Sequence, residues 1–221
     1  MAVIHRTTLE PGKLELLASW LPSRPWYRGG GGGPELANAG GFRLDDPRGA
    51  VGIEFIVATD TSGTLPDTYL VPLTYRGAPL DGADHALVGT MEHGVLGRRW
   101  VYDGCQDPVM VAQLLALIEG RAEAQDQNVS DSPDQDVTRS YTGGGPVPAD
   151  FTGPATDDRD GTELPGPDGS GLRLHRLLRP VGDGPVPLPP GTTGHVAGSW
   201  QQPGGGRARG LFAVLRAARR V

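Results

Sequence analysis

Cysteine and lysine are almost absent from this sequence, and each shortage removes a class of function. Of the 221 residues, one is a cysteine, Cys105, and one is a lysine, Lys13. A single cysteine makes neither an internal disulfide nor a zinc site built from several thiolates. The net charge is −6. Because binding to phosphates needs clustered Lys and Arg, a general nucleic-acid-binding protein is disfavoured.

Long apolar runs are also missing. No stretch of the sequence approaches the roughly 18 uninterrupted apolar residues that a membrane-spanning helix needs. Residues 1–6 lack the basic segment and apolar run of a secretory signal peptide. We therefore expect a cytoplasmic protein that has no membrane partner.

The motifs of common active sites do not occur. The glycine run at 29–33 is not followed by Lys-Ser or Lys-Thr, so it is typical of a flexible loop and not of a phosphate-binding loop. No Gly-x-Ser-x-Gly is present, and the five histidines share no metal-ligand spacing. Asp45-Asp46-Pro47 indicates a turn, and Cys105 is expected to be an unreactive thiol. We predict no catalytic, metal-binding or cofactor-binding residue.

The sequence is rich in glycine (35) and proline (21), which gather between segments that have the patterns of ordered structure. Residues 10–20 have Pro11 in the first turn and carry apolar residues at helical spacing, which predicts an amphipathic helix. Residues 51–59 and 68–75 are rich in β-branched and aromatic side chains and predict an antiparallel hairpin. Pro72 places the second of these strands at an edge or a bulge.

A further strand and the clearest helix come next along the chain. Residues 98–102 predict a strand. Asp107 is a natural N-cap and Pro108 suits the first helical position. The apolar stripe of this second helix is formed by Val111, Leu114, Leu115, Ile118 and Ala122.

The remaining half of the chain divides into two parts. Residues 128–170 are polar, acidic and rich in Gly and Pro, and have too few large apolar residues to offset the entropy of ordering, so we predict a disordered linker. Residues 171–221 contain strand patterns at 172–178 and 194–200, and a third strand or short helix at 209–216. We expect a small β-rich segment there.

Four segments together resemble a known family. MAVIHRTTLEPGKLELLASWLP, GGFRLDDPRGAVGIEF, TYLVPLTYRGAPL and EHGVLGRRWVYDG are similar to the N-terminal cap domain of actinobacterial maltokinases. The resemblance covers residues 1–127 and implies a cystatin-like α+β cap, with a curved antiparallel sheet packed on helices. The β-rich segment at 171–221 resembles the region that follows the cap in the family. The resemblance also implies a role in the metabolism of trehalose and glycogen, where full-length maltokinases phosphorylate maltose with ATP.

The chain departs from those kinases after the cap. Phosphoryl transfer needs a loop over the phosphates, a lysine on the nucleotide, a base and magnesium-binding carboxylates. Lys13 lies in the first predicted helix, and no catalytic-loop or Asp-Phe-Gly segment is present. Kinase activity and ATP binding are therefore not carried over from the family.

Aromatic and arginine residues are enriched in binding hot spots, and aromatic faces also suit sugar rings. Three short clusters of this kind leave core packing, a protein interface and sugar contact open as alternatives. The candidate interface residues are Trp26, Tyr27, Arg28, Tyr75, Arg76, Arg98, Arg99 and Trp100.

The sequence leaves three functions open. The first is a non-catalytic interaction module of the maltokinase-cap type, whose partner is a kinase-like or glucan-metabolising protein. The second is the cap subunit of a split sugar kinase. The third is a module that binds an α-glucan through exposed aromatics such as Trp26 and Tyr27.

Overall fold

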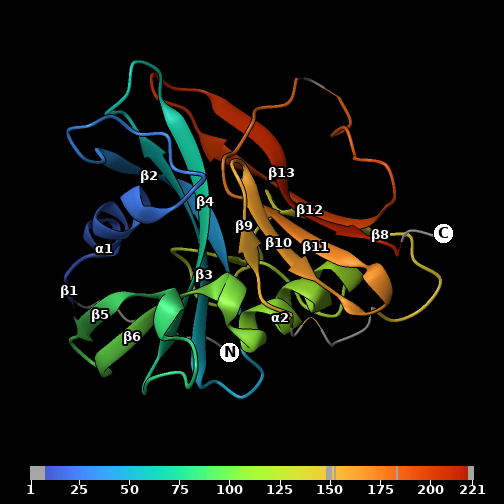
Figure 1. The fold of residues 1–221 in the computed structure, drawn as a ribbon, viewed down its shortest axis with the longest axis horizontal. Helices are drawn as coiled ribbons and strands as arrows, with labels where there is room; N and C mark the ends of the chain where they lie inside the picture. The colour runs from blue at the N-terminus through green and yellow to red at the C-terminus, as the bar shows by residue number, and fades with distance from the viewer. Residues whose placement is uncertain (1–7, 148–150, 152, 183, 219–221) are drawn as a thin grey trace.

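The hairpin predicted from residues 51–75 is the centre of the first of two sheets. The computed structural model describes residues 8–147, 151, 153–182 and 184–218. In it, β3 (Val51–Asp60) and β4 (Asp67–Arg76) pair antiparallel over their whole length. They belong to a curved seven-stranded sheet in the order β1-β5-β6-β4-β3-β2-β7 (Figure 1). Its other strands are β1 (Leu9–Glu10), β2 (Leu36–Leu44), β5 (Leu87–His93), β6 (Gly97–Asp103) and β7 (Gln125–Asp126).

The second sheet has six strands, in the order β8-β12-β13-β11-β10-β9. Its longest strands, β12 (Thr192–Gln201) and β13 (Arg207–Arg216), form a hairpin. The turn between them contains three consecutive glycines at positive φ, which side chains disfavour. The segment at 209–216 is therefore a strand and not a helix. The other strands are β8 (Thr138–Tyr141), β9 (Thr156–Asp157), β10 (Gly161–Pro165) and β11 (Gly171–His175).

Three of these strands lie where the sequence predicted a disordered linker. β8, β9 and β10 all fall within 128–170 and pair with other strands of the second sheet. Three of the apolar residues of the segment are placed in the core, with Val147 9%, Phe151 6% and Leu164 1% exposed. Composition alone missed this because packing against the rest of the chain, and not local hydrophobicity, orders the segment.

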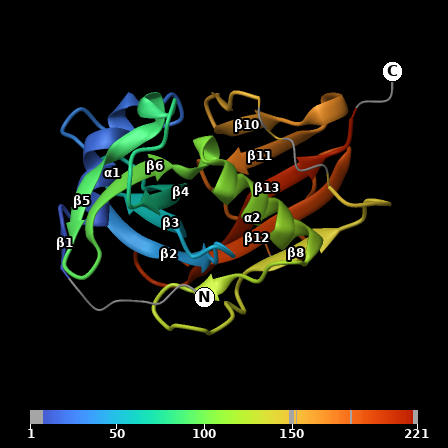
Figure 2. The same ribbon diagram turned by 90° about the horizontal axis from the view of Figure 1, so that it is seen from below.

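Two α-helices accompany the sheets, so the predicted α+β class is confirmed. α1 (Lys13–Trp20) packs on β2 and β5 of the first sheet, and α2 (Pro108–Glu119) packs on β2, β8 and β12 (Figure 2). Asp107 caps α2 as predicted, accepting from the Val109 backbone N–H at 3.0 Å. The short 3-10 helices are η1 (Leu21–Ser23), η2 (Asp84–Ala86), η3 (Gly104–Gln106) and η4 (Pro167–Gly169). Residues 2–8 are β-prone and predict a short strand, which falls, except for its last residue, outside the described residues.

The two sheets share one hydrophobic core, to which α2 also contributes. Within it the rings of Phe42 and Phe55 stack at 4.3 Å between centroids, and Phe212 of the second sheet lies parallel to Phe42 at 6.1 Å. A second cluster fills the opposite face of the first sheet, under α1. The boundaries at 127 and 170 drawn from the sequence remain predictions.

Pro72 does not place β4 at an edge. β4 lies between β3 and β6, but β6 pairs with it only from Leu73 onward, so Pro72 lies one residue outside that ladder. The first half of β4 instead contacts the chain after β11, where the Leu70 N–H donates to the Arg176 carbonyl oxygen at 2.9 Å. The two sheets therefore meet along β4.

Arg176 stabilises this junction from inside. Its side chain is fully buried, and Nη2 donates to both carboxylate oxygens of Asp103, each at 2.6 Å, while Nε donates to Thr162 Oγ1 at 2.7 Å. Its guanidinium lies 5.2 Å from the Trp26 ring centroid. Burial opposes the positive charge, but the Asp103 carboxylate outweighs it and raises the pKa of Arg176. One side chain thus joins the end of β6 to β10.

The thiol of Cys105, next to Arg176, is kept unreactive by its burial. Cys105 is 3% exposed and its Sγ accepts from Arg176 Nη2 at 3.0 Å. Burial raises the pKa of Cys105 well above its ordinary value. The thiol therefore stays protonated at neutral pH, as expected from its flanking residues.

His175 on β11 makes the stability of the protein depend on pH. Burial, followed by the charge of Arg173, lowers its pKa from 6.5 to about 4. Between these values the unfolded chain binds a proton that the folded chain does not, so stability is full above pH 6.5 and falls toward pH 4. The slope of the unfolding free energy against pH is proportional to the number of protons bound on unfolding. We expect His175→Gln to reduce that number by about one. Urea titrations at about pH 4.5 to 7 measure it, and an unchanged slope would contradict this assignment.

Candidate functional site

A hollow of about 430 Å³ opens on the face of the first sheet that α1 covers. α1 has eight residues, so it shields only part of this face, and the hollow lies beside its first turn. Cross-strand register sets the floor: Arg43 of β2 is opposite Glu54 of β3, and Gly52 of β3 is opposite Tyr75 of β4. A side chain at position 52 would press on the Tyr75 ring at 3.3 Å, so glycine keeps the floor open.

Three side chains form a hydrogen-bonded group at the wall. Lys13 Nζ lies 2.8 Å from Glu54 Oε1 and 2.6 Å from Oε2, and the Tyr75 hydroxyl donates to Glu54 Oε2 at 2.8 Å. Glu54 is 6% exposed, so this carboxylate is held by a cation and a phenol in place of water. Burial, and next the Glu54 charge, raise the pKa of Tyr75 well above its ordinary value, which keeps the phenol a neutral donor.

The second carboxylate at the hollow is structural. Asp46 accepts from the backbone N–H groups of Arg48, Ala50 and Val51 at 2.9–3.0 Å. Burial opposes its ionisation, but these three donors outweigh burial and lower the pKa of Asp46. The prediction that Asp45-Asp46-Pro47 is a turn and not an acid–base pair agrees with this geometry.

Two guanidinium groups at the hollow have no carboxylate within ion-pair distance among the described residues. Arg43 Nε donates to the Asp126 carbonyl oxygen at 3.2 Å. Arg99 Nη2 donates to the Leu96 carbonyl oxygen at 2.9 Å. Arg99 Nε is buried and has no hydrogen-bond partner in the described part of the chain. The hollow therefore combines uncompensated positive charge with a fixed carboxylate and phenol.

Core packing, a protein interface and sugar contact were the alternatives for Trp26, and the structure places it in the core. It is 0% exposed and packs on Trp20 and Tyr69, each at 5.8 Å between ring centroids. The Pro-rich loop around it suggested exposure, but the loop folds back after η1 and its tryptophan fills the core. Tyr27, half-buried, donates to Asp60 Oδ2 at 2.9 Å, and Arg28 pairs with Asp160 at 2.8 Å.

The other predicted interface residues do not lie together. Tyr75 and Arg99 line the hollow. Arg76 is engaged by Asp107, with two hydrogen bonds of 2.7 Å each. Arg98 is exposed and lies 5.4 Å from the half-buried Trp100 ring. The eight candidates thus do not form one surface.

Sequence reasoning missed Lys13, Arg43 and Glu54 as site residues. Two signals for them existed: Lys13 is the sole lysine, and Glu54 is the one charged residue inside the otherwise uncharged run 51–59. Buried charges are rare unless they are paired, so a lone carboxylate in such a strand points to a specific partner. Arg43 became a candidate only once the register placed it opposite Glu54.

The parts of the chain that the structure describes offer no candidate for a metal site or a membrane-spanning helix. No three or more His, Cys, Asp and Glu side chains in those parts gather in a way that would hold a metal ion. None of the described helices combines the length and apolarity needed to cross a bilayer.

Comparison with known proteins gives a family match, which falls within the first sheet and α1. Residues 20–107 match the family model of the maltokinase N-terminal cap domain. The matched segment runs from the last residue of α1 through β2–β6 to the cap of α2, and covers less than half of the chain. The resemblance to this family is therefore confirmed over residues 20–107, and its extension to residues 1–127 stays a prediction. No curated protein matches the chain.

Proposed function

We propose, from the match of residues 20–107 to the maltokinase N-terminal cap, that this chain is a non-catalytic interaction module of α-glucan metabolism. Its partner is a kinase-like or glucan-metabolising enzyme of the cytoplasm. The chain binds this enzyme and adjusts its activity, and it does not transfer phosphate itself.

The observation that carries this proposal is the second sheet, which continues directly from the cap. α2 and the strands β8–β13 pack on the cap and share its core, and the sequence has no phosphate loop followed by lysine and no Asp-Phe-Gly segment of the kind that phosphoryl transfer uses. The sole lysine is ion-paired to Glu54 at the start of α1. These features favour a role in binding.

The proposal is tested by affinity capture followed by a binding measurement. The tagged full chain is exposed to native extract of its source organism, with the heat-denatured chain as control, and bound proteins are identified by mass spectrometry. We expect a maltokinase-like or glucan-metabolising enzyme, which purified material should then bind in a saturable titration. Failure of every such enzyme to bind the purified chain would refute the proposal.

Activity assays separate this role from that of a cap subunit in a split sugar kinase. ATP-dependent phosphorylation of maltose is measured for the partner alone, the chain alone and the mixture. A rate that appears only in the mixture identifies the split kinase, whereas a modulated rate of an already active partner supports the interaction module. Turnover by the purified chain alone would overturn its non-catalytic assignment.

A further inference from the structure

We infer that the hollow beside α1 is a binding site for a small organic anion, held through its phosphate or carboxylate groups by Arg43 and Arg99. This inference goes beyond the proposed function and rests on the geometry of the hollow alone.

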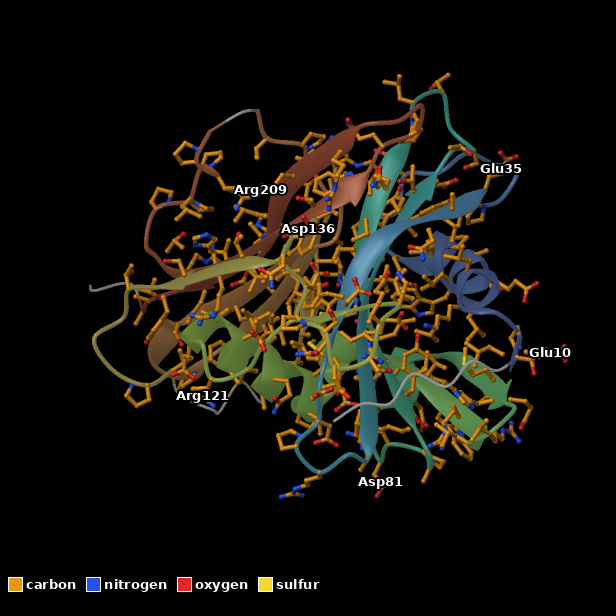
Figure 3. All side chains as sticks on the ribbon, turned by 180° about the vertical axis from the view of Figure 1, so that it is seen from behind. Glu10, Glu35, Asp81, Arg121, Asp136 and Arg209 are labelled. Carbon is orange, nitrogen blue, oxygen red and sulfur yellow. The ribbon has the colours of Figure 1, made fainter. Side chains whose placement is uncertain are left out.

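The local charge of the hollow favours an anion. The whole chain carries −6, and acidic side chains such as Glu10, Glu35 and Asp81 project outward from the rim of the first sheet (Figure 3). The hollow reverses this balance, because three cationic side chains and two carboxylates line it. A concave positive site on an acidic protein attracts anions selectively.

The hydrogen bonds of the charged groups in the hollow also favour an anion as the ligand. Glu54 is neutralised by Lys13 at 2.6 Å, and the oxygens of Asp46 are turned to backbone N–H groups. Arg43 and Arg99 donate to carbonyl oxygens, and Arg99 Nε has no partner in the described part of the chain. Guanidinium groups in this state present free donors that match the geometry of phosphate and carboxylate.

The spacing of the two arginines sets the size of the ligand. They lie on β2 and β6, which are separated by β3 and β4. Arg43 is level with Asp103 in the register, so Arg99 is offset from it by three strand spacings and by four residues along β6, which puts their backbones about 19 Å apart. Their long side chains line the same hollow. The floor between them is open at Gly52 and bounded by the Tyr75 ring. The body of a small organic molecule fits over this floor, and the volume of about 430 Å³ lies within the usual range for such ligands.

Calorimetric titration of the full chain tests the inference. The probes are glucose 6-phosphate and citrate, which differ in the source of the anionic group, and maltose, which is neutral. We expect at least one anion to bind with an affinity that falls as salt is raised, and maltose not to bind at the same concentrations. Arg43→Gln and Arg99→Gln should each weaken anion binding by about tenfold or more.

Arg98→Gln is the matched control, because Arg98 precedes Arg99 on β6 yet does not line the hollow. It should bind the anion as the unchanged chain does. The two test variants lie on different strands, so a folding defect in one, detected by circular dichroism, leaves the other decisive. The inference is overturned if neither anion binds, if maltose binds as tightly as the anions, or if folded Arg43→Gln and Arg99→Gln both bind normally. The affinity capture of a protein partner is a separate experiment from this titration. A failed capture therefore refutes the proposed function without bearing on the anion site.

Discussion

Arg176→Ala is expected to lower the free energy of unfolding by about 3–5 kcal/mol. The substitution strands the Asp103 carboxylate, which is 6% exposed and accepts two hydrogen bonds of 2.6 Å from Arg176. It also removes the Thr162 contact and the cation beside the Trp26 ring. A buried charge left without its partner costs far more than the pair contributes in net terms. Urea denaturation followed by tryptophan fluorescence measures the loss.

The matched control is Arg28→Ala. Arg28 also forms an ion pair with a residue beside the second sheet, Asp160, but the two side chains are 40% and 55% exposed. Solvent screens such a pair, so we expect a loss below about 1 kcal/mol. The double variant Arg176→Met, Asp103→Leu should recover part of the stability that Arg176→Ala loses, because it leaves no charge buried at this junction. Equal losses for Arg28→Ala and Arg176→Ala would contradict the proposed role of Arg176.

Asp107→Ala is expected to cost about 3 kcal/mol of unfolding free energy through two losses at one residue. The fully buried Asp107 caps α2 through the Val109 N–H, and removal of an N-cap costs about 1 kcal/mol. It also receives two hydrogen bonds of 2.7 Å from Arg76, and hydrogen bonds to charged groups contribute about 1.5–3 kcal/mol. Chemical denaturation monitored by far-ultraviolet circular dichroism measures the change.

Asp107→Asn separates the two contributions. Asparagine also accepts a hydrogen bond at an N-cap, so the start of α2 is retained while the charge that Arg76 contacts is lost. We expect a stability between those of the unchanged chain and Asp107→Ala. A loss for Asp107→Asn equal to that for Asp107→Ala would assign the whole effect to the ion pair.

Local sequence patterns were sufficient for the elements whose cause is local. The β3–β4 hairpin follows from β-branched residues on both sides of a polar turn, and the start of α2 follows from Asp107 and Pro108. The order imposed on 128–170 was not predictable in this way. Phe151 and Leu164 are isolated in sequence and become core residues only because distant strands surround them. Contacts of this kind leave no periodic signal.

The candidate site was predictable only in part, for a related reason. Tyr75 and Arg99 were selected by residue type and do line the hollow. Trp26 was selected by the same rule and is buried, because a tryptophan beside prolines looks the same in sequence whether its loop turns outward or inward. Arg43 and Glu54 were missed because their proximity depends on the register between β2 and β3.

The parallel rings of Phe42, Phe55 and Phe212 determine how a shortened fragment of this chain would behave. The segment that matches the cap family ends at residue 107, ahead of every strand of the second sheet. A fragment cut there would leave one face of β2 and β3 uncovered, with bare phenylalanine exposed to water and prone to aggregate. We therefore expect residues 20–107 and the second sheet to unfold as one cooperative unit, so that the segment matching the cap family is not a detachable module here.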